Sequence, residues 1–468
     1  MSASDSIAPG GGSIDDVVAR IERMPISWWH VRTRIIIGVA TFFDAFDALA
    51  IAFVLPVLVP LWKLNGPQIG FLIAAGYLGQ LAGALFFGWI AERYGRLTAV
   101  VWSILIFAVM SLACAFAWDY RSLIVARTIQ GFGLGGEVPV AATYISELAR
   151  AKGRGRFVLL YELIFPVGLV ATGLVGAYVV PRYGWQWMFV IGALPAFVAL
   201  FLQRLLPESP RWLATHGRQK DAQAALAFIE RETEKSTGQT LPAPLPPPYP
   251  PPLAGEDREG AEGKAASWSD LFGPLYLRRT LVVWVIWFAA YFFNYGLVVW
   301  LPTIYSTVFK LPLQQSLQYG LITQAVGFCG ALTCALTIDR VGRRPWFAFA
   351  FAMNAIALGA LYVLGPDSPQ RVLAFVSSGY FFVSVLSIGV YVYTPELYPT
   401  RARAVAVGTA TAWLRFASIL GPSIVGAIVG SGLGKVFLMF AAVAVIGAVV
   451  TGLFAVETKG RILEDVSP

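Results

Sequence analysis

The feature that most constrains this chain is its series of apolar segments long enough to cross a membrane. About 20 consecutive apolar residues span a bilayer as an α-helix. The sequence contains twelve such segments, at 34–62, 68–91, 98–118, 122–149, 157–181, 185–206, 280–303, 316–338, 346–365, 370–394, 404–430 and 434–456. Only 13% of the residues are charged, against roughly 25% in a typical soluble protein. We therefore predict an all-α integral membrane protein with twelve transmembrane helices.

The distribution of basic residues predicts which side of the membrane each loop faces. With an even number of spans, both termini lie on one side, and that side holds 27 of the 35 Lys and Arg residues. Loops that carry most of the Lys and Arg face the cytoplasm. We expect both termini to be cytoplasmic and the protein to lie in the plasma membrane, the inner membrane of a bacterium. The net charge of +8 then reflects topology, and we expect no nucleic-acid partner.

The two halves of the chain resemble each other in sequence. GWIAERYGR at 88–96 aligns with ALTIDRVGR at 335–343, and the Glu-Leu pair at 147–148 aligns with the pair at 396–397. A repeat of six helices is a parallel repeat, related by an axis along the membrane normal, with the substrate site near the midplane between the repeats. We predict two six-helix bundles related by a pseudo-twofold axis.

A polar, proline-rich segment separates the halves. It contains LPAPLPPPYPPPLAGEDREGAEGK, whose proline density favours extended, solvated chain over a packed core. The alternative to a plain linker is a segment that binds a partner domain with affinity for proline-rich peptides. The expected order is a cytoplasmic N-terminal segment, a first bundle, a cytoplasmic linker, a second bundle and a cytoplasmic tail, at 1–33, 34–206, 207–279, 280–456 and 457–468.

Several motifs resemble those of the major facilitator superfamily of transporters. The loop GWIAERYGR and its second copy at 335–343 are similar to the family motif Gly-x-x-x-Asp-Arg-x-Gly-Arg, with Glu92 where the family usually has Asp. RTIQGFGLGGEVPVAATYISELA at 127–149 resembles the second family motif, and PESPRWL at 207–213 resembles the exit from span six. The matches cover nearly the whole chain. They imply a secondary transporter that works by alternating access between two six-helix bundles.

Within that superfamily, the sequence is similar to the organic-ion and aromatic-acid:proton symporter branch, which includes bacterial nicotinate transporters. YTPELYPTRAR at 393–403 resembles the organic-ion branch, and DAFD at 44–47 resembles the Asp-Gly-x-Asp of aromatic-acid:proton symporters, with Ala45 in place of glycine. Sugar porters typically carry glutamines in span seven, where this chain has YFFNYGLVVW. The resemblance implies proton-coupled import of a small aromatic carboxylate, nicotinate- or benzoate-like.

Two aspartates in the first span are the candidates for proton coupling. Asp44 and Asp47 are three residues apart, so they share a helix face, which must look into the protein or a water-filled cavity. The alternative is that one of them neutralises a structural arginine. Resemblance to proton-coupled sugar porters pairs Asp47 with Arg127 in span four, and such an ion pair can break when the aspartate is protonated. Glu162 in span five is a secondary candidate.

Arg415 in span eleven is the candidate for binding an anion. It lies too far from either end of a long apolar span for its charge to reach the interface, and a guanidinium can bind a carboxylate with two hydrogen bonds. The alternative is a structural pair with a remote acid such as Glu162. Aromatic and amide side chains of spans seven and eight complete the expected substrate site, with plain helix packing as the alternative: Tyr291, Phe292, Asn294, Tyr295 and Gln324.

Charged residues in and around four loops resemble the cytoplasmic gate of the superfamily. The resemblance implies acid–base pairs that hold the cytoplasmic side closed, formed by Glu92, Arg93, Arg96, Glu147, Arg154, Asp339, Arg340, Arg343, Glu396 and Arg403. Solvent-exposed pairs are worth about 0–1 kcal/mol each. A network of such pairs can therefore break and re-form during transport.

The sequence also argues against several other functions. The glycines at 131–136 fit a dinucleotide fingerprint, but no strand precedes them and they lie within a span, so we interpret them as packing glycines. The histidines and cysteines form no ligand-like cluster. We expect a monomer with no cofactor, no metal site and no enzymatic activity. The alternatives are a transporter of a sugar or another neutral or cationic solute, and a membrane sensor that does not transport.

Overall fold

Twelve long helical segments build the molecule. The computed structural model describes residues 14–148, 161, 163–244, 271–274, 276–398 and 400–459. Within these residues, eleven segments are long and apolar enough to cross a membrane. The twelfth is α5 (Tyr120–Leu148), which has 29 residues. Its hydropathy is lowered by Arg127, Glu137 and Glu147, although it packs between α3 (Gly66–Tyr94) and α4 (Arg96–Ala115) like any other span. The predicted twelve-helix fold is confirmed.

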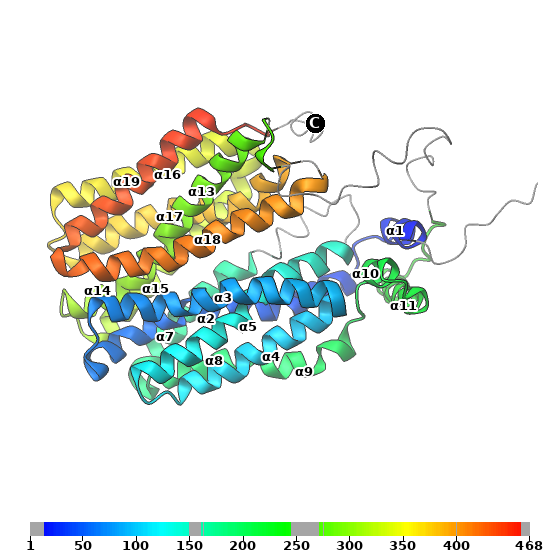
Figure 1. Cartoon of the computed structure of the whole chain (residues 1–468), viewed down its shortest axis with the longest axis horizontal. Helices are drawn as coiled ribbons and strands as arrows, with labels where there is room; N and C mark the ends of the chain where they lie inside the picture. The colour runs from blue at the N-terminus through cyan, green and yellow to red at the C-terminus, as the bar shows by residue number, and fades with distance from the viewer. Residues whose placement is uncertain are drawn as a thin grey trace, which may run out of the picture.

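The spans form two halves that lie against each other (Figure 1). Besides α3, α4 and α5, the first half contains α2 (Trp28–Trp62), α7 (Ile164–Tyr183), α8 (Gln186–Gly192) and α9 (Pro195–Leu205). The second half contains α13 (Leu277–Gly296), η2 (Val298–Trp300), α14 (Leu301–Thr307), α15 (Leu313–Val341), α16 (Arg343–Leu364), α17 (Pro369–Glu396), α18 (Thr400–Ile428), η3 (Val429–Ser431) and α19 (Leu433–Phe454).

The contacts between the halves follow the sequence repeat. α3 packs against α18, and α7 packs against α15. These are spans two and eleven, and spans five and eight. Exchange of the two halves turns one contact into the other, as a pseudo-twofold axis requires.

Matching loops strengthen this relation. Gly95 before α4 and Gly342 before α16 have nearly the same positive φ, 111° and 101°, a backbone conformation that favours glycine. The Glu208 carboxylate accepts hydrogen bonds from backbone N–H groups at the start of α4, and the Glu457 carboxylate does the same at the start of α16. In each half, a glutamate that follows the last span therefore caps the first turn of the third span. Burial raises the pKa of the Glu208 carboxyl, although these hydrogen bonds oppose the rise.

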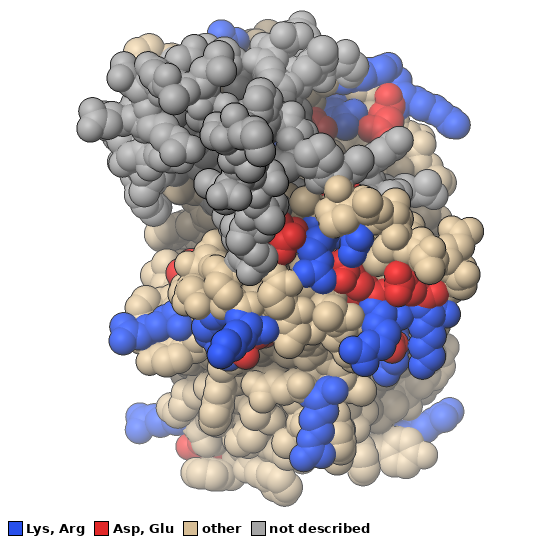
Figure 2. Space-filling model, turned by 90° about the vertical axis from the view of Figure 1, so that its right-hand side faces the viewer, with Lys and Arg blue, Asp and Glu red and all other residues tan. Residues whose placement is uncertain are grey.

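Acidic and basic side chains gather at one end of the bundle, which we call the charged end (Figure 2). The loops around Gly95 and Gly342 lie there. At the opposite end, α3 and α18 approach closely, since a Cβ atom added to Gly66 would lie 2.3 Å from the carbonyl oxygen of Gly426. One turn further, a Cβ on Gly70 would lie 2.6 Å from the carbonyl oxygen of Pro422. In this structure the two halves are therefore in tight contact at the end opposite to the charged end.

A cap of three short helices covers the charged end of the first half (Figure 1). It consists of α1 (Ile14–Glu22), α10 (Pro210–Thr215) and α11 (Gln219–Thr237), which pack on one another. We expected 207–279 to be a linker, but apolar residues of α11 recur at helical spacing and are buried, as Leu226 and Ile229 illustrate. The first part of that segment is thus a folded element. Residues 245–270, which include most of the prolines, lie outside the described residues.

The close packing of α3 and α5 generates a test with a matched control. A Cβ on Gly83 would lie 1.9 Å from the backbone oxygen of Phe132, whereas nothing lies within 4 Å of a Cβ on Gly88 in the same helix. We expect Gly83→Ala to lower the stability of the folded protein by about 1–3 kcal/mol, because the helices must separate. Gly88→Ala should leave stability unchanged or raise it slightly. Thermal unfolding of both variants in detergent, followed by fluorescence, measures the difference, and equal midpoints would contradict this packing.

The docking of α1 on α11 generates a second prediction. Arg20 and Arg23 donate hydrogen bonds to the Glu230 carboxylate at 2.5–2.9 Å. Burial works against the charge of Glu230, but these hydrogen bonds hold the pKa of its carboxyl below the usual 4.5. The carboxylate therefore stabilises docking above pH 4.5, and this stabilisation is lost as the pH falls through the lower folded pKa. We expect Glu230→Gln to weaken docking by about 1 kcal/mol at pH 7.

Hydrogen–deuterium exchange of the α1 amides measures this effect. Exchange should accelerate about fivefold in Glu230→Gln at pH 7. The control Glu234→Gln changes a half-buried glutamate one turn later on α11, whose carboxylate accepts a hydrogen bond from the backbone N–H of Leu241, and it should exchange like the wild type. If the exchange rate of the α1 amides is unchanged in Glu230→Gln, apolar contacts alone hold α1 on α11.

Candidate functional site

A buried ion pair lies in the first half, between α2 and α5. Nη1 of Arg127 is 2.8 Å from Oδ2 of Asp47, and both side chains are almost completely buried. Gln130, one turn after Arg127 on α5, completes the network. Its Nε2 donates to Oδ1 of Asp47 at 2.6 Å, and its Oε1 accepts from Nη1 of Arg127 at 2.8 Å. Both oxygens of Asp47 therefore have a hydrogen-bond donor.

The surroundings of this pair keep water away from it. Gly76 of α3 lets the guanidinium approach, because a Cβ there would lie 3.2 Å from Nη2 of Arg127. The guanidinium also lies 5.9 Å from the ring centre of Phe189 on α8, which allows a cation–π interaction. Removing one partner of such a buried pair costs about 3–5 kcal/mol, because it leaves an uncompensated charge. A proton on Asp47 removes the charge that attracts Arg127, so protonation is the change that can break the pair.

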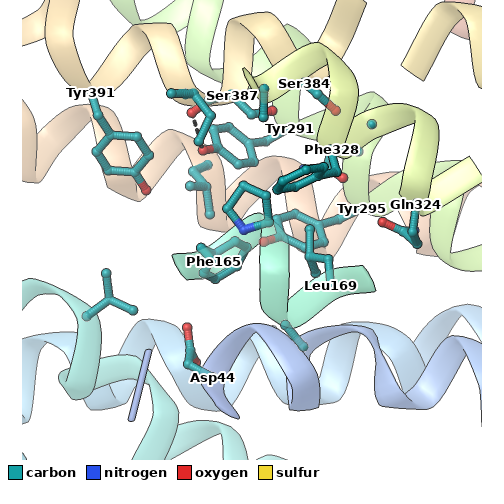
Figure 3. A pocket seen from close by; sticks show the side chains of 18 of the residues that line it. Asp44, Phe165, Leu169, Tyr291, Tyr295, Gln324, Phe328, Ser384, Ser387 and Tyr391 are labelled. Atoms are coloured by element: carbon teal, nitrogen blue, oxygen red, sulfur yellow. Dashed lines mark hydrogen bonds between the residues drawn. The ribbon is translucent and has the colours of Figure 1, made fainter. Parts of the chain in front are cut away.

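A pocket lies between the two halves, and its lining includes Asp44, one helical turn before Asp47 on α2 (Figure 3). It encloses about 820 Å³ of space that no atom fills, part of it continuous with solvent. The second half contributes most of the lining, from α13, α15, α17 and α18, and the first half contributes residues of α2, α3, α5 and α7.

Aromatic rings dominate the walls of the pocket. Figure 3 shows the rings of Phe165, Tyr291, Tyr295, Phe328 and Tyr391 around the same space. The Tyr291 hydroxyl donates to the backbone oxygen of Ser387 at 3.1 Å, which fixes that ring against α17. The rings of Tyr291 and Tyr295 are stacked at 5.8 Å. Such walls offer flat apolar surface to a planar ring.

Arg415 of α18 brings a positive charge to this aromatic pocket. Its Nη1 donates a hydrogen bond to Oε1 of Gln80 on α3, so the contact joins the two halves. Among the described residues, no carboxylate oxygen lies within 4.0 Å of the guanidinium. The remaining guanidinium donors are therefore available to an anionic ligand.

Asp44 approaches the same pocket from the first half. It lines the pocket together with Arg415, and Figure 3 shows its carboxyl pointing from α2 towards the aromatic rings. The side chain is only 5% exposed, and its Oδ1 has no hydrogen-bond partner among the described residues. The two aspartates of the first span thus have different surroundings, since Asp47 is fully paired and Asp44 faces the pocket.

The structure brings most of the expected substrate-site residues together. Tyr291, Asn294, Tyr295, Gln324 and Arg415 all line the pocket. Phe292 does not, because successive residues of α13 point in different directions. Its ring packs on Phe288 at 5.3 Å and on Phe440 of α19 at 5.1 Å, inside the second half. Glu162 lies outside the described residues.

At the charged end, three of the expected first-half gate residues form one connected network. Arg96 pairs with Glu92 at 2.7 Å and with Glu147 of α5 at 3.2 Å. The guanidinium of Arg93 lies over the ring of Trp89, 5.7 Å from its centre. Arg154 lies outside the described residues.

The second half repeats this arrangement. Arg343 pairs with Asp339 at 3.0 Å and with Glu396 of α17 at 2.9 Å. The backbone oxygen of Arg340 accepts a hydrogen bond from Lys459. Arg403 is half-buried, and its Nε has no partner among the described residues. The ion pairs found among the described gate residues all join residues of the same half, so none of them holds the halves together here.

Sequence reasoning missed several residues of the two sites. Gln130 completes the Asp47 network and Gln80 orients Arg415, and each is a polar residue inside an apolar span, which is a usable signal. Four more polar residues of the pocket come from α17, where they recur at helical spacing and so share one face: Tyr380, Ser384, Ser387 and Tyr391. That spacing was present in the sequence, but nothing there showed that this face lines a cavity.

Comparison with solved structures identifies the fold. The crystal structure of a D-xylose–proton symporter matches with a TM-score of 0.71 and 19% identity, over 92% of this chain and 99% of that one. An inward-open structure of the xylose transporter XylE from E. coli also matches with a TM-score of 0.71, over 93% of this chain and 99% of that one. At this level of identity the likeness concerns the fold.

Sequence comparison finds closer relatives. The niacin transporter NiaP of Acinetobacter baylyi is 33% identical, over 96% of this chain and 99% of that protein. The putative niacin/nicotinamide transporter NiaP of Bacillus subtilis is 28% identical, over 91% and 96%. The synaptic vesicle 2-related protein of Xenopus laevis is 29% identical, over 97% and 82%. The family described as "Sugar (and other) transporter" matches residues 45–468. The chain therefore belongs to this family of multi-pass membrane transporters, within the major facilitator superfamily.

Proposed function

We propose that this transporter is a proton-coupled symporter that imports a small aromatic carboxylate, nicotinate- or benzoate-like. The observation that carries the proposal is the position of Arg415, a cation without a carboxylate partner among the described residues, in an aromatic pocket between the two halves. A guanidinium binds a carboxylate through two charge-assisted hydrogen bonds, and the tyrosine rings offer a planar surface to an aromatic ring. The similarity to niacin transporters supports the same substrate class.

The coupling to protons rests on Asp47 and Arg127. Arg127 stays charged at any working pH, so a proton on Asp47 is what can release the pair at 2.8 Å. Asp47 lies on α2, three residues from the pocket residue Asp44. Protonation of Asp47 would therefore free α2 and α5 to shift relative to each other, beside the substrate.

In this proposal the charged end faces the cytoplasm, because the loops and tails on that side carry most of the Lys and Arg. The contact of Gly66 with Gly426 then closes the extracellular side. The gate networks around Arg96 and Arg343 stay within their own halves in this state. They would join across the halves when the cytoplasmic side closes, as alternating access requires.

A sugar or another neutral solute is the second candidate. The amide side chains of Gln80, Asn294 and Gln324 line the pocket and can hydrogen-bond hydroxyl groups. The solved relatives of the same fold include a xylose symporter. Proteoliposome uptake under an imposed pH gradient, with carboxylates and sugars compared at equal concentration, decides between the two candidates.

The proton mechanism predicts a specific defect in Asp47→Asn. Asparagine cannot take up a proton, so the variant should lose accumulation of substrate driven by a pH gradient. Exchange of labelled for unlabelled substrate without a gradient should continue, because it needs no net proton transfer. The matched control is Asp367→Asn, which makes the same change at an exposed position. Full gradient-driven accumulation in Asp47→Asn would rule out this role.

The anion site predicts that Arg415→Ala weakens binding of carboxylates. The loss should be about 10- to 100-fold in dissociation constant, the effect of losing hydrogen bonds to a charged group. Arg415→Lys should recover part of the lost affinity, because lysine restores the positive charge but not the paired N–H donors of the guanidinium. Binding of nicotinate and benzoate to purified protein, by isothermal titration calorimetry, measures both variants. An unchanged affinity in Arg415→Ala would remove the anion site from the proposal.

A further inference from the structure

Asp44 is a buried carboxyl group that the proton switch at Asp47 and the anion site at Arg415 leave unused. Its side chain is 95% buried, and it lines the substrate pocket from the first half. Its Oδ1 receives no hydrogen bond from any described residue. Figure 3 shows the carboxyl directed at the aromatic rings that cover the pocket. A buried polar atom with no partner is costly, so a ligand in this pocket that supplied one would gain affinity.

The charges around Asp44 define what such a ligand has to offer. Arg415 lines the same pocket and attracts the charge of Asp44, while Asp47 on the same helix repels it. Arg415 is also held by Gln80, and no nitrogen of a described Lys or Arg lies within 4.0 Å of the Asp44 carboxylate. The pocket therefore has an acidic group on the first half, a basic group on the second half and aromatic side chains in its walls.

We propose that Asp44 shares one proton with a basic nitrogen in the ring of the substrate, so that the pocket selects pyridine carboxylates over benzene carboxylates. The inference rests on the proposed function, since it places the substrate carboxylate on Arg415. The ring then lies between the tyrosines, and its nitrogen points to Asp44. Asp44 becomes a specificity-determining residue, which narrows the nicotinate-like or benzoate-like class to its nitrogen-containing members.

The number of protons in the complex is the same whether Asp44 or the ring nitrogen holds the shared proton. Either the protonated Asp44 carboxyl donates an O–H to the neutral ring nitrogen, or the Asp44 carboxylate accepts an N–H from the protonated ring. Both arrangements contain one proton, one hydrogen bond and the same total charge. That proton enters with the substrate and leaves when the hydrogen bond is broken. A benzene ring has no atom that can take part, so Asp44 stays without a partner when benzoate binds.

The wild-type protein tests this inference before any variant is made. Dissociation constants are measured by calorimetry, on the full chain in detergent, for benzoate and for the pyridine 2-, 3- and 4-carboxylates. All four ligands have nearly the same size and the same carboxylate, and they differ in the presence and position of the ring nitrogen. We expect one pyridine isomer to bind about 10- to 100-fold more tightly than benzoate. The other isomers should resemble benzoate, because their nitrogen points away from Asp44.

The variant Asp44→Ala then assigns the preference to a residue. It should bring the affinity of the preferred isomer to within about threefold of benzoate, while benzoate itself binds as well as before or better. Ser384→Ala is the control, because it removes a polar group from the same pocket and should keep the preference. A monodisperse elution profile and a wild-type unfolding temperature show that each variant is folded. If Asp44→Ala does not fold, the test uses Asp44→Leu together with the wild-type affinities for benzoate and the three pyridine carboxylates.

The outcomes separate this inference from the proposed function. Equal wild-type affinity for benzoate and for all three pyridine isomers overturns the role of Asp44 and leaves carboxylate transport intact. The role of Asp44 is also overturned if Asp44→Ala keeps the preference for one isomer. It is overturned too if Asp44→Ala changes the affinity of all four ligands by the same factor, which is the result expected if Asp44 only balances the charge of Arg415. If none of the four carboxylates binds, the proposed function fails and the inference fails with it.

Discussion

The buried ion pair of Asp47 and Arg127 is the interaction on which the proposed mechanism depends. A charged side chain inside a membrane is tolerated only where protein or water compensates it. Here the compensation is nearly complete, because Gln130 supplies both an acceptor and a donor to the pair. Such a network is rigid while it is intact, and the loss of one charge leaves the other exposed to a medium that cannot solvate it. In the proposed mechanism, a single proton on Asp47 is therefore what changes which helices are held together.

The helices beside the pair, α3 and α5, pack closely because glycines line the contact between them. A Cβ on Gly131 of α5 would lie 2.0 Å from the backbone oxygen of Gly76 on α3, and one on Gly135 would lie 2.1 Å from that of Gln80. The glycines at 131–136, whose spacing fits a dinucleotide fingerprint, thus form a packing surface. The same close approach brings Gln80 to the edge of the pocket, where it meets Arg415.

The fold could be read from the sequence because a bilayer permits few solutions. Segments of sufficient length have to be helices, and the internal repeat then fixes the two halves. Individual side-chain roles were harder to predict. Asp47 and Arg127 were matched through resemblance, since they are 80 residues apart in the chain. Phe292 illustrates the difficulty, because an aromatic residue among aromatic residues carries no sign of which one faces a cavity.

The folded cap at the charged end was missed for a related reason. The proline-rich run dominates the composition of the segment between the halves, and it concealed a short amphipathic helix, α11, that precedes it. Polar residues inside apolar spans were the more reliable guide to the pocket. Arg415, Asn294 and Gln324 were found in this way, and Gln80 would have been found by applying the same criterion to every span.

The carboxylate caps that close each half have a consequence for how the chain is made. The backbone N–H groups at Arg96, near the start of the third span, find their partner only in Glu208, after the sixth span. Glu457 has the same relation to Arg343 in the second half. As the ribosome adds residues in order, the third span of each half enters the membrane with its first turn still bound to water. The cap of the third span in each half is therefore completed only after the last span of that half has been made.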